Sequence, residues 1–325
     1  MIILNRQQMW DAVTLDEIMD AVEKAYAIHK SGAYYMPDRF VASRDKDMML
    51  YMPCFTDEAI GTKMLAEFPN NPEKGLPYLN GLMLLNDAET GLPTAVMDGS
   101  TVTAMRTGAA GGVALKYLSR KDCHSLGLVG CGVQGLHQLI FACHVRPIKD
   151  IYLFDAYKKD LQPFIDSFYA KSGRTDIAIH ICANTRELAA NSDILISATQ
   201  TVAPVYPDDE ELLRGKCFIA IGSWRPERRE LPDAVHRLVK NVYTELPYAC
   251  EESGDLRIPI ESGLLTEDKI LYMEDLIADT KTGKPHTHNE TTCFKSVGMA
   301  LYDVCTAAVI YNNAVKNNIG TRIEW

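Results

Sequence analysis

The sequence predicts an α/β protein that combines a doubly wound, Rossmann-type dinucleotide-binding domain with a second α/β domain. From Ser125 onward, hydrophobic strand patterns alternate with helix patterns, which is the order expected of a parallel sheet with crossover helices. Gly130, Gly132 and Gly135 form a G-x-G-x-x-G motif directly after the first strand pattern. The segment before this motif has helix and strand patterns of its own, so we expect a separate domain there.

Each glycine of the motif has its own role. The first permits the tight turn from strand to helix, the second lets the backbone approach a pyrophosphate, and the third lets the helix pack close to the strand. The helix that follows presents free N–H groups and its positive dipole end to the phosphates. A glycine-rich turn of an unrelated α/β protein is the alternative. The strand, the helix, the second strand and its terminal acid together favour a dinucleotide site.

Asp155 is that terminal acid. It ends the next strand pattern, where a carboxylate can accept hydrogen bonds from the two hydroxyls of an adenosine ribose. The same charge repels a 2′-phosphate and therefore favours NAD(H) over NADP(H). Lys158 and Lys159 follow and could offset part of this repulsion.

The segment before the glycine motif opens with an amphipathic helix pattern. Thr14 and Glu17 form a capping box at its start. Residues 86–91 are typical of a hairpin connection, with Gly91 supplying the positive φ. The expected strands of this segment are 48–52, 60–65, 79–85 and 94–97, followed by a helix of small residues over 101–118.

From Ser125 the expected strands are 126–130, 151–155, 177–182, 193–198, 217–222 and 241–245, and the expected helices are 133–144, 157–171 and 185–190. A last helix pattern places Val297, Leu301, Val304 and Ala308 on one face. Since no strand pattern accompanies it, we expect this helix to pack on the first domain. The predicted domains are 1–120 with 295–325, for substrate and dimerisation, and 121–294, for the dinucleotide.

Composition excludes several classes of function. The formal net charge of −10 argues against nucleic acid or an anionic membrane as a partner. No apolar run is long enough to span a membrane, and the first residues do not resemble a signal peptide. The nine cysteines include no C-x-x-C pair, which is typical of reduced thiols in the cytoplasm.

Taken together, the motifs resemble those of the ornithine cyclodeaminase/μ-crystallin family, in the same order along nearly the whole chain. The helix with Arg106, the Glu-Leu pair after Pro226 and the Phe-Lys-Ser-Val-Gly segment are jointly specific. The matching segments are 36–39, 61–63, 88–93, 103–108, 130–135, 221–222, 226–231, 252–256 and 294–298.

The resemblance implies a homodimeric, NAD-dependent enzyme that acts on a small amino or imino acid. It implies that Arg39, Lys63 and Arg106 bind the substrate carboxylate, which guanidinium and ammonium groups suit. Lys63 and Arg106 are the expected catalytic residues, with Lys63 supplying or accepting the proton at nitrogen. Solvated surface positions are the alternative for each of the three.

The expected cofactor contacts extend beyond the glycines and Asp155. They are Val133, Gln134, Thr199, Gly222, Ser296 and Val297. Ser296 and Val297 resemble positions that border the nicotinamide in this family. Helix capping is the alternative for Ser296.

Two acidic residues of the cyclodeaminases are missing. Leu50 stands where those enzymes carry a glutamate, and Trp224 where they carry an aspartate. Cyclodeamination needs a base for an ammonium and an acid for the leaving amine, whereas reduction of a preformed imine needs less. The losses favour an imine reductase or amino-acid dehydrogenase. An ornithine or lysine cyclodeaminase, with Glu58, Glu67 or Asp255 serving instead, and a non-catalytic binding protein stay as alternatives.

Trp224 and Arg225 are expected to shape the substrate pocket, where Arg225 can meet a second carboxylate. His286 and His288 have a spacing seen in metal sites, but no cluster of further ligands accompanies them. A polar loop is favoured over zinc, and no metal is expected.

Overall fold

The computed structural model describes residues 1–283 and 290–324, so His286 and His288 lie outside the described residues. The chain divides into two compact units, Met1–Arg106 with Met299–Trp325 (unit 1) and Thr107–Gly298 (unit 2). This division differs from the expected boundaries because it falls inside helix α3 (Gly99–Leu118). From Thr107 onward this helix belongs with unit 2, where Gln138 Nε2 donates to Thr107 O at 2.6 Å.

Unit 1 is built on one sheet with the strand order β16-β1-β7-β6-β5-β4-β2, and β3 pairs with β4 at its edge. The four strands expected here are confirmed as the antiparallel run β4 to β7. The hairpin before β7 has Gly91 at φ 70°, as expected. The strands are β1 (Ile2–Leu4), β2 (Tyr34–Tyr35), β3 (Phe40–Arg44), β4 (Asp47–Thr56), β5 (Ile60–Glu67), β6 (Leu79–Asn86), β7 (Pro93–Asp98) and β16 (Thr321–Arg322).

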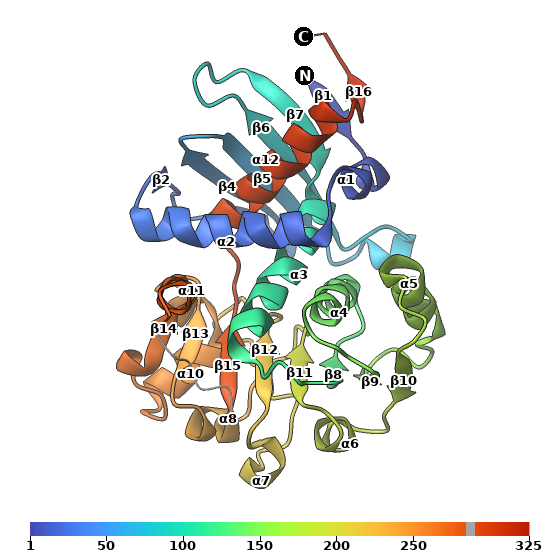
Figure 1. Cartoon of the computed structure of the whole chain (residues 1–325), viewed down its shortest axis with the longest axis vertical. Helices are drawn as coiled ribbons and strands as arrows, with labels where there is room; N and C mark the ends of the chain where they lie inside the picture. Colours follow the sequence, from blue (N-terminus) through green and yellow to red (C-terminus); the bar gives the residue numbers. More distant parts are fainter. Residues whose placement is uncertain (284–289, 325) are drawn as a thin grey trace. The chain divides into compact units, whose positions relative to one another are not determined.

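Besides the first part of α3, the helices of unit 1 are α1 (Arg6–Ala12), α2 (Leu15–Ser31) and α12 (Ala300–Lys316), with a short 3₁₀ helix at Pro72–Lys74. Helices α12 and α1 contact this sheet, and α2 packs on α12. The capping box of Thr14 and Glu17 is confirmed at the start of α2. Helix α12 packs on α2 and on β4, β5 and β6, which confirms the expected return of the C-terminal helix (Figure 1).

One detail of the prediction for the C-terminal helix was wrong. Val297 lies before α12, because Met299 is its extended N-cap residue. Ser296 caps no helix, so the alternative role for that side chain is also wrong.

Unit 2 contains an entirely parallel sheet with the order β10-β9-β8-β11-β12-β15-β13-β14. This confirms the doubly wound Rossmann architecture. The strands are β8 (Ser125–Val129), β9 (Asp150–Phe154), β10 (Ala178–Ile181), β11 (Ile194–Ser197), β12 (Cys217–Ala220), β13 (Val242–Thr244), β14 (Ile270–Tyr272) and β15 (Thr292–Lys295). Strands β8, β11, β12 and β15 are buried along their whole length.

The helices of unit 2, besides the rest of α3, are α4 (Val133–Val145), α5 (Gln162–Ser172), α6 (Thr185–Ala190), α7 (Glu210–Leu213), α8 (Asp233–Leu238), α9 (Ala249–Glu252), α10 (Gly254–Glu261) and α11 (Met273–Lys281), with a 3₁₀ helix at Glu267–Lys269. The helix expected from residue 157 begins later, at Gln162. Asp155 Oδ1 accepts the N–H groups of Tyr157 and Lys158 at 3.0 Å each, and this holds both residues in a turn.

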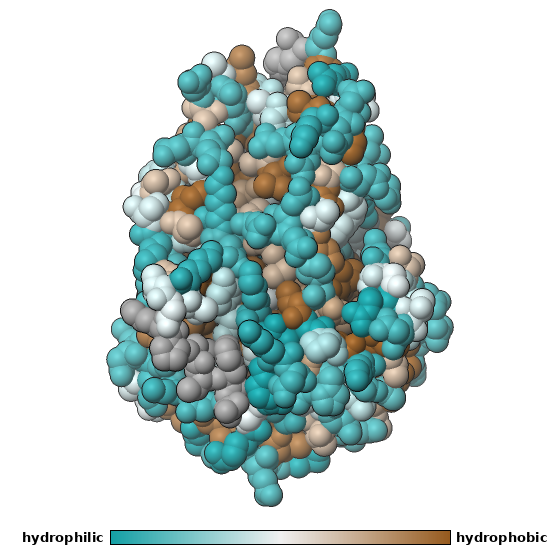
Figure 2. Space-filling model, viewed as in Figure 1, coloured by the Kyte–Doolittle hydropathy of each residue, from teal (hydrophilic) through white to brown (hydrophobic). Residues whose placement is uncertain are grey.

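The face of the molecule drawn in Figure 2 is mostly hydrophilic, with hydrophobic residues in scattered groups. None of the helices in the described part of the chain is long and apolar enough to cross a membrane.

Candidate active site

The glycine motif forms the turn between β8 and α4 in unit 2. Gly130 has φ 98°, and a Cβ there would lie 2.6 Å from Ala198 O. A Cβ at Gly135 would collide with Gly130 O, whereas one at Gly132 would meet no atom within 4 Å. Close packing therefore requires the outer two glycines, and the middle glycine borders open space that a ligand can use.

The start of α4 fits an anion. Gly132 is the N-cap residue and offers no side-chain acceptor to the first N–H groups of the helix. Val133 is exposed beside it. Among the described residues, Gln134 Oε1 is buried without a hydrogen-bond partner. These groups suit a pyrophosphate next to the glycine turn.

Asp155 ends β9 beside the glycine turn. Its Oδ2 accepts the N–H of Cys131 at 2.9 Å, and its Oδ1 binds the turn that follows. Burial by itself would raise the pKa of this carboxyl, but the backbone donors of Lys158, Tyr157 and Cys131 outweigh it and lower the pKa. Asp155 is therefore a fixed negative charge at the strand tip.

A cavity of about 640 Å³ in unit 2 lies between the glycine turn and Asp155. Pockets for small ligands and cofactors have volumes in this range. The cavity is lined by the ends of β8, β9 and β11 and by the loops after them, including Gly130, Gly132, Asp155, Lys158 and Thr199. Arg228 also lines it and was not among the residues expected from the sequence. The guanidinium offers a positive charge for a phosphate.

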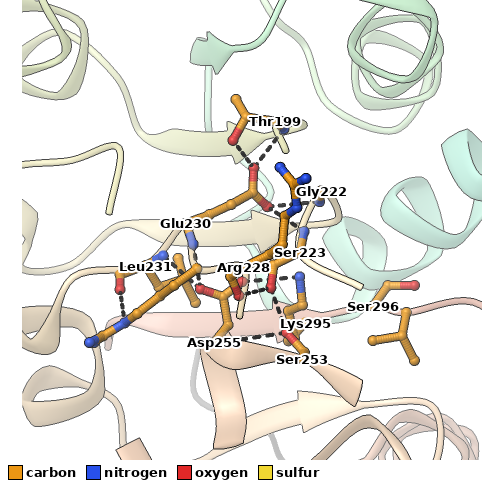
Figure 3. A network of polar contacts seen from close by, with 12 residues as sticks. Thr199, Gly222, Ser223, Arg228, Glu230, Leu231, Ser253, Asp255, Lys295 and Ser296 are labelled. Carbon is orange, nitrogen blue, oxygen red and sulfur yellow. Dashed lines mark hydrogen bonds and ion pairs between the residues drawn. The ribbon is translucent and has the colours of Figure 1, made fainter. Parts of the chain in front are cut away.

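Glu230 links the strand ends beside this cavity (Figure 3). Its Oε1 accepts from both N and Oγ1 of Thr199 at 2.7 Å, and its Oε2 accepts from Gly222 N at 2.7 Å. Thr199 follows β11 and Gly222 follows the neighbouring β12. The carboxylate is fully buried, which raises its pKa despite these donors. Glu230 thus fixes two of the expected cofactor positions relative to each other.

A second buried carboxylate supports Glu230. Asp255 Oδ1 accepts the N–H of Glu230 at 2.7 Å and that of Leu231 at 2.8 Å, and Asp255 Oδ2 lies 3.1 Å from Lys295 Nζ (Figure 3). Asp255 and Lys295 are both fully buried. Asp255 was considered as a substitute catalytic acid. Its contacts show that it fixes the backbone N–H groups of Glu230 and Leu231 instead.

The loop after β15 contains Ser296 and Val297. Glu245 Oε1 accepts from Ser296 Oγ at 2.9 Å and from Val297 N at 2.7 Å, and also from Gly298 N. Glu245, Ser296 and Val297 are buried, so these hydrogen bonds are shielded from water. Glu245 was missed by sequence reasoning because its partners lie about fifty residues further along the chain.

Trp224 and Arg225 follow Gly222 in the same unit. The guanidinium of Arg225 lies 4.6 Å from the centre of the Trp224 ring, a cation–π contact. Trp224 packs against the hydrophobic core of unit 2. No carboxylate occupies position 224, and an indole with a stacked cation stands there instead.

Unit 1 contains a buried cluster of charges. Lys63 projects from β5, Arg106 from α3 and Asp303 from the first turn of α12. Asp303 Oδ1 lies 2.7 Å from Lys63 Nζ and 3.0 Å from Arg106 Nε. The side chains of Lys63 and Asp303 are fully buried, and that of Arg106 is 8% exposed. Two of the expected substrate-binding residues therefore meet on a carboxylate that the sequence analysis did not identify.

The electrostatics of this cluster make Lys63 able to exchange a proton at neutral pH. Burial, followed by the charge of Arg106, lowers the pKa of Lys63 to about 7, while Asp303 acts in the opposite direction. Arg39, which is partly exposed in the segment before β3, lowers the pKa of Lys63 further. All three expected cations thus act on one site.

The register of the sheet explains the role of Leu50. Met52 lies opposite Lys63, and Leu50 lies opposite Leu65 on the same face. Leu50 is buried, so this face has an apolar group at the position where the resemblance to cyclodeaminases would place an acid. Glu67 shares the face further along β5, where its Oε2 accepts a hydrogen bond from the phenol Oη of Tyr78 at 2.9 Å.

The other acid considered in unit 1 lies at the surface. Glu58 is exposed and forms an ion pair with Lys24. Among the described residues, no group of three or more His, Cys, Asp or Glu side chains could hold a metal ion.

Comparison with known proteins places these features in one family. The model of the ornithine cyclodeaminase/mu-crystallin family matches residues 1–318. The alanine dehydrogenase of Archaeoglobus fulgidus is 33% identical over 325 residues, covering 100% of this chain and 98% of that protein.

Solved structures are similar to this chain over nearly its whole length. The Delta(1)-pyrroline-2-carboxylate reductase of Thermococcus litoralis, in complex with NADH and L-proline, is 35% identical with a TM-score of 0.90, covering 99% of this chain and 100% of that one. An archaeal alanine dehydrogenase dimer with bound NAD is 29% identical with a TM-score of 0.88, covering 100% and 99%. The chain belongs to the ornithine cyclodeaminase/mu-crystallin family.

Proposed function

We propose that this protein is an NAD(H)-dependent oxidoreductase that reduces an α-imino acid to an amino acid, or catalyses the reverse reaction. The observation that carries the proposal is the buried cluster of Lys63, Arg106 and Asp303, in which the pKa of Lys63 is near 7. A group with such a pKa can both give and take a proton at nitrogen under physiological conditions. The similarity to a pyrroline-2-carboxylate reductase and an alanine dehydrogenase supports the same chemistry.

Unit 1 would bind the substrate. Lys63 and Arg106 both contact one buried protein carboxylate, and Arg39 is near enough to Lys63 to lower its pKa, so these three basic groups suit the carboxylate of an imino acid. In this proposal Arg106 and Arg39 orient the acid, and Lys63 donates a proton to the nitrogen as the imine is reduced. Trp224 and Arg225 are the further residues that would limit the size and charge of the substrate.

Unit 2 would bind the dinucleotide, which supplies or accepts the hydride when bound. Asp155 is placed to accept the ribose hydroxyls, and the start of α4, with Gly132, Val133 and Gln134, suits the pyrophosphate. Arg228 adds a cation to this cavity. Glu230 fixes the positions of Thr199 and Gly222. Glu245 fixes those of Ser296 and Val297.

The two apolar replacements favour reduction over cyclodeamination. Leu50 and Trp224 remove acids that would deprotonate an amine and protonate leaving ammonia, and Glu58 and Asp255 are engaged elsewhere. Reduction of an imine requires one proton at nitrogen, and Lys63 can supply it.

The proposal is tested with purified protein and NADH. We expect NADH absorbance to fall with pyrroline-2-carboxylate or with pyruvate plus ammonia, and to stay constant without an imine. Formation of proline and ammonia from ornithine with catalytic NAD, without NADH accumulation, would identify a cyclodeaminase instead. Binding of ligands without turnover of any imine would identify a binding protein.

We also propose that the protein works as a homodimer in the cytoplasm, with unit 1 forming the interface. The dimeric archaeal alanine dehydrogenase supports the assembly. All nine cysteines are free, which suits a reducing compartment. Light scattering after size-exclusion chromatography should give twice the mass of the chain, and a monomeric mass would contradict this part of the proposal.

A further inference from the structure

Asp303 has an unusual set of contacts. Both cations, Lys63 and Arg106, bind its Oδ1, whereas Oδ2 is buried and has no hydrogen-bond partner among the described residues. An unpartnered buried oxygen of this kind costs free energy, so its retention calls for a reason beyond stability.

The charges around Lys63 come from several elements. Arg106 on α3 and Arg39 before β3 both repel a charged lysine, while Asp303 on α12 attracts it. Cys54 on β4 and Cys305 on α12 lie in the same region, and burial raises the pKa of each thiol to about 12, so both are neutral. Asp303 is therefore the negative charge that favours the protonated form of Lys63 against burial and two arginines.

We infer that Asp303 is a positioning residue, which holds the ammonium group of Lys63 charged and in place for proton delivery to the substrate nitrogen. The inference rests on the proposed function. In the reduction a hydride from NADH forms the new C–H bond and the C=N double bond becomes single. The nitrogen takes the proton of Lys63, and water restores it. Asp303 acts through Lys63 and exchanges no proton with the substrate.

The test uses Asp303→Asn in the full-length protein. Removing the negative charge should lower the pKa of Lys63 by about one unit or more. NMR of 13Cε-labelled lysine, with the Lys63 signal assigned from Lys63→Arg, measures this titration without any substrate. The basic limb of the pH profile of kcat for imine reduction should move to lower pH by the same amount, with NADH affinity unchanged.

Two variants serve as matched comparisons. Asp303→Glu keeps the negative charge, so the basic limb of its kcat profile should lie near that of the original protein. Glu58→Gln removes a carboxylate from an exposed ion pair in the same unit and should leave the profile unchanged. Asp303→Ser carries the same expectation as Asp303→Asn and leaves space for water, so it replaces that variant if the latter does not fold.

Two results would overturn the inference. An unchanged Lys63 titration in Asp303→Asn would show that Asp303 does not control the charge of Lys63. A lowered pKa of Lys63 with an unchanged pH profile of kcat would show that the effect of Asp303 on Lys63 does not serve proton delivery. Absence of imine reduction by the original protein would instead contradict the proposed function, and the NMR titration would still show whether Asp303 controls the charge of Lys63.

Discussion

At the scale of single residues, Arg106 offers a test that separates the proposed substrate binding from cofactor binding. It belongs to unit 1 and contacts Asp303, whereas the cavity proposed for the dinucleotide belongs to unit 2. Replacing it by Ala should raise KM for the imino acid by roughly 30-fold or more, since loss of one partner of a buried charged contact costs about 2–5 kcal/mol. The dissociation constant of NADH, measured by fluorescence, should change little.

Arg6→Ala is the control for this change, because Arg6 forms an exposed ion pair with Asp98 in the same unit. Its KM should match that of the original protein. Weakened NADH binding in Arg106→Ala with unchanged KM would reverse the assignment of this arginine.

The charge of Lys63 also has a consequence for stability. Its pKa of about 7 in the folded protein lies below the ordinary value of 10.5, so between these values the unfolded chain binds the proton more tightly. The cost of burying the charged lysine is therefore present at low pH and is lost as pH rises. Lys63→Met should gain stability relative to the original protein below pH 7, and the gain should shrink toward pH 10.

Differences in Tm between the two proteins across this pH range measure the effect and cancel contributions from the buried thiols. A gain that is independent of pH would show that Lys63 titrates normally. Lys24→Met, at an exposed lysine of the same unit, should show no such trend.

At the scale of elements, the glycine turn offers a comparison between neighbouring positions. Gly135→Ala places a Cβ against Gly130 O, and should lower Tm by several degrees. Gly132→Ala meets no protein atom within 4 Å and should keep its Tm. Its methyl group occupies the space assigned to the pyrophosphate, so NADH affinity should fall at least tenfold. Unchanged NADH affinity in Gly132→Ala would place the phosphates elsewhere.

Elements with a local signal were predictable from the sequence. The capping box of Thr14 starts α2, and alternating apolar residues mark β4 to β7. Strand β15 has no such signal, because it contains a lysine. Lys295 is nevertheless fully buried, next to Asp255, which lies forty residues earlier in the chain. Helix α5 begins late because Asp155 orders the turn before it, which a periodic pattern does not reveal.

The same reasoning applies to the candidate site. The glycines and Asp155 follow a motif with fixed spacing, so the sequence alone predicts them as a site. Asp303 is 240 residues from Lys63 and 197 from Arg106, so only the fold reveals their contact. The one local hint is an acidic residue in the first turn of a buried, otherwise apolar helix.

At the scale of the whole molecule, each unit should respond to its own ligand. NADH should slow hydrogen exchange in unit 2, at the turn after β8 and the loops after β9, β11 and β12, because these line the cavity or contact Glu230. An imino acid or its amino-acid product, added at saturating dinucleotide, should slow exchange further in β5 and α12 of unit 1, which hold Lys63 and Asp303. Arg106→Ala should abolish the second effect and keep the first. Protection of β5 and α12 by NADH alone, with the glycine turn unaffected, would contradict this division of binding between the units.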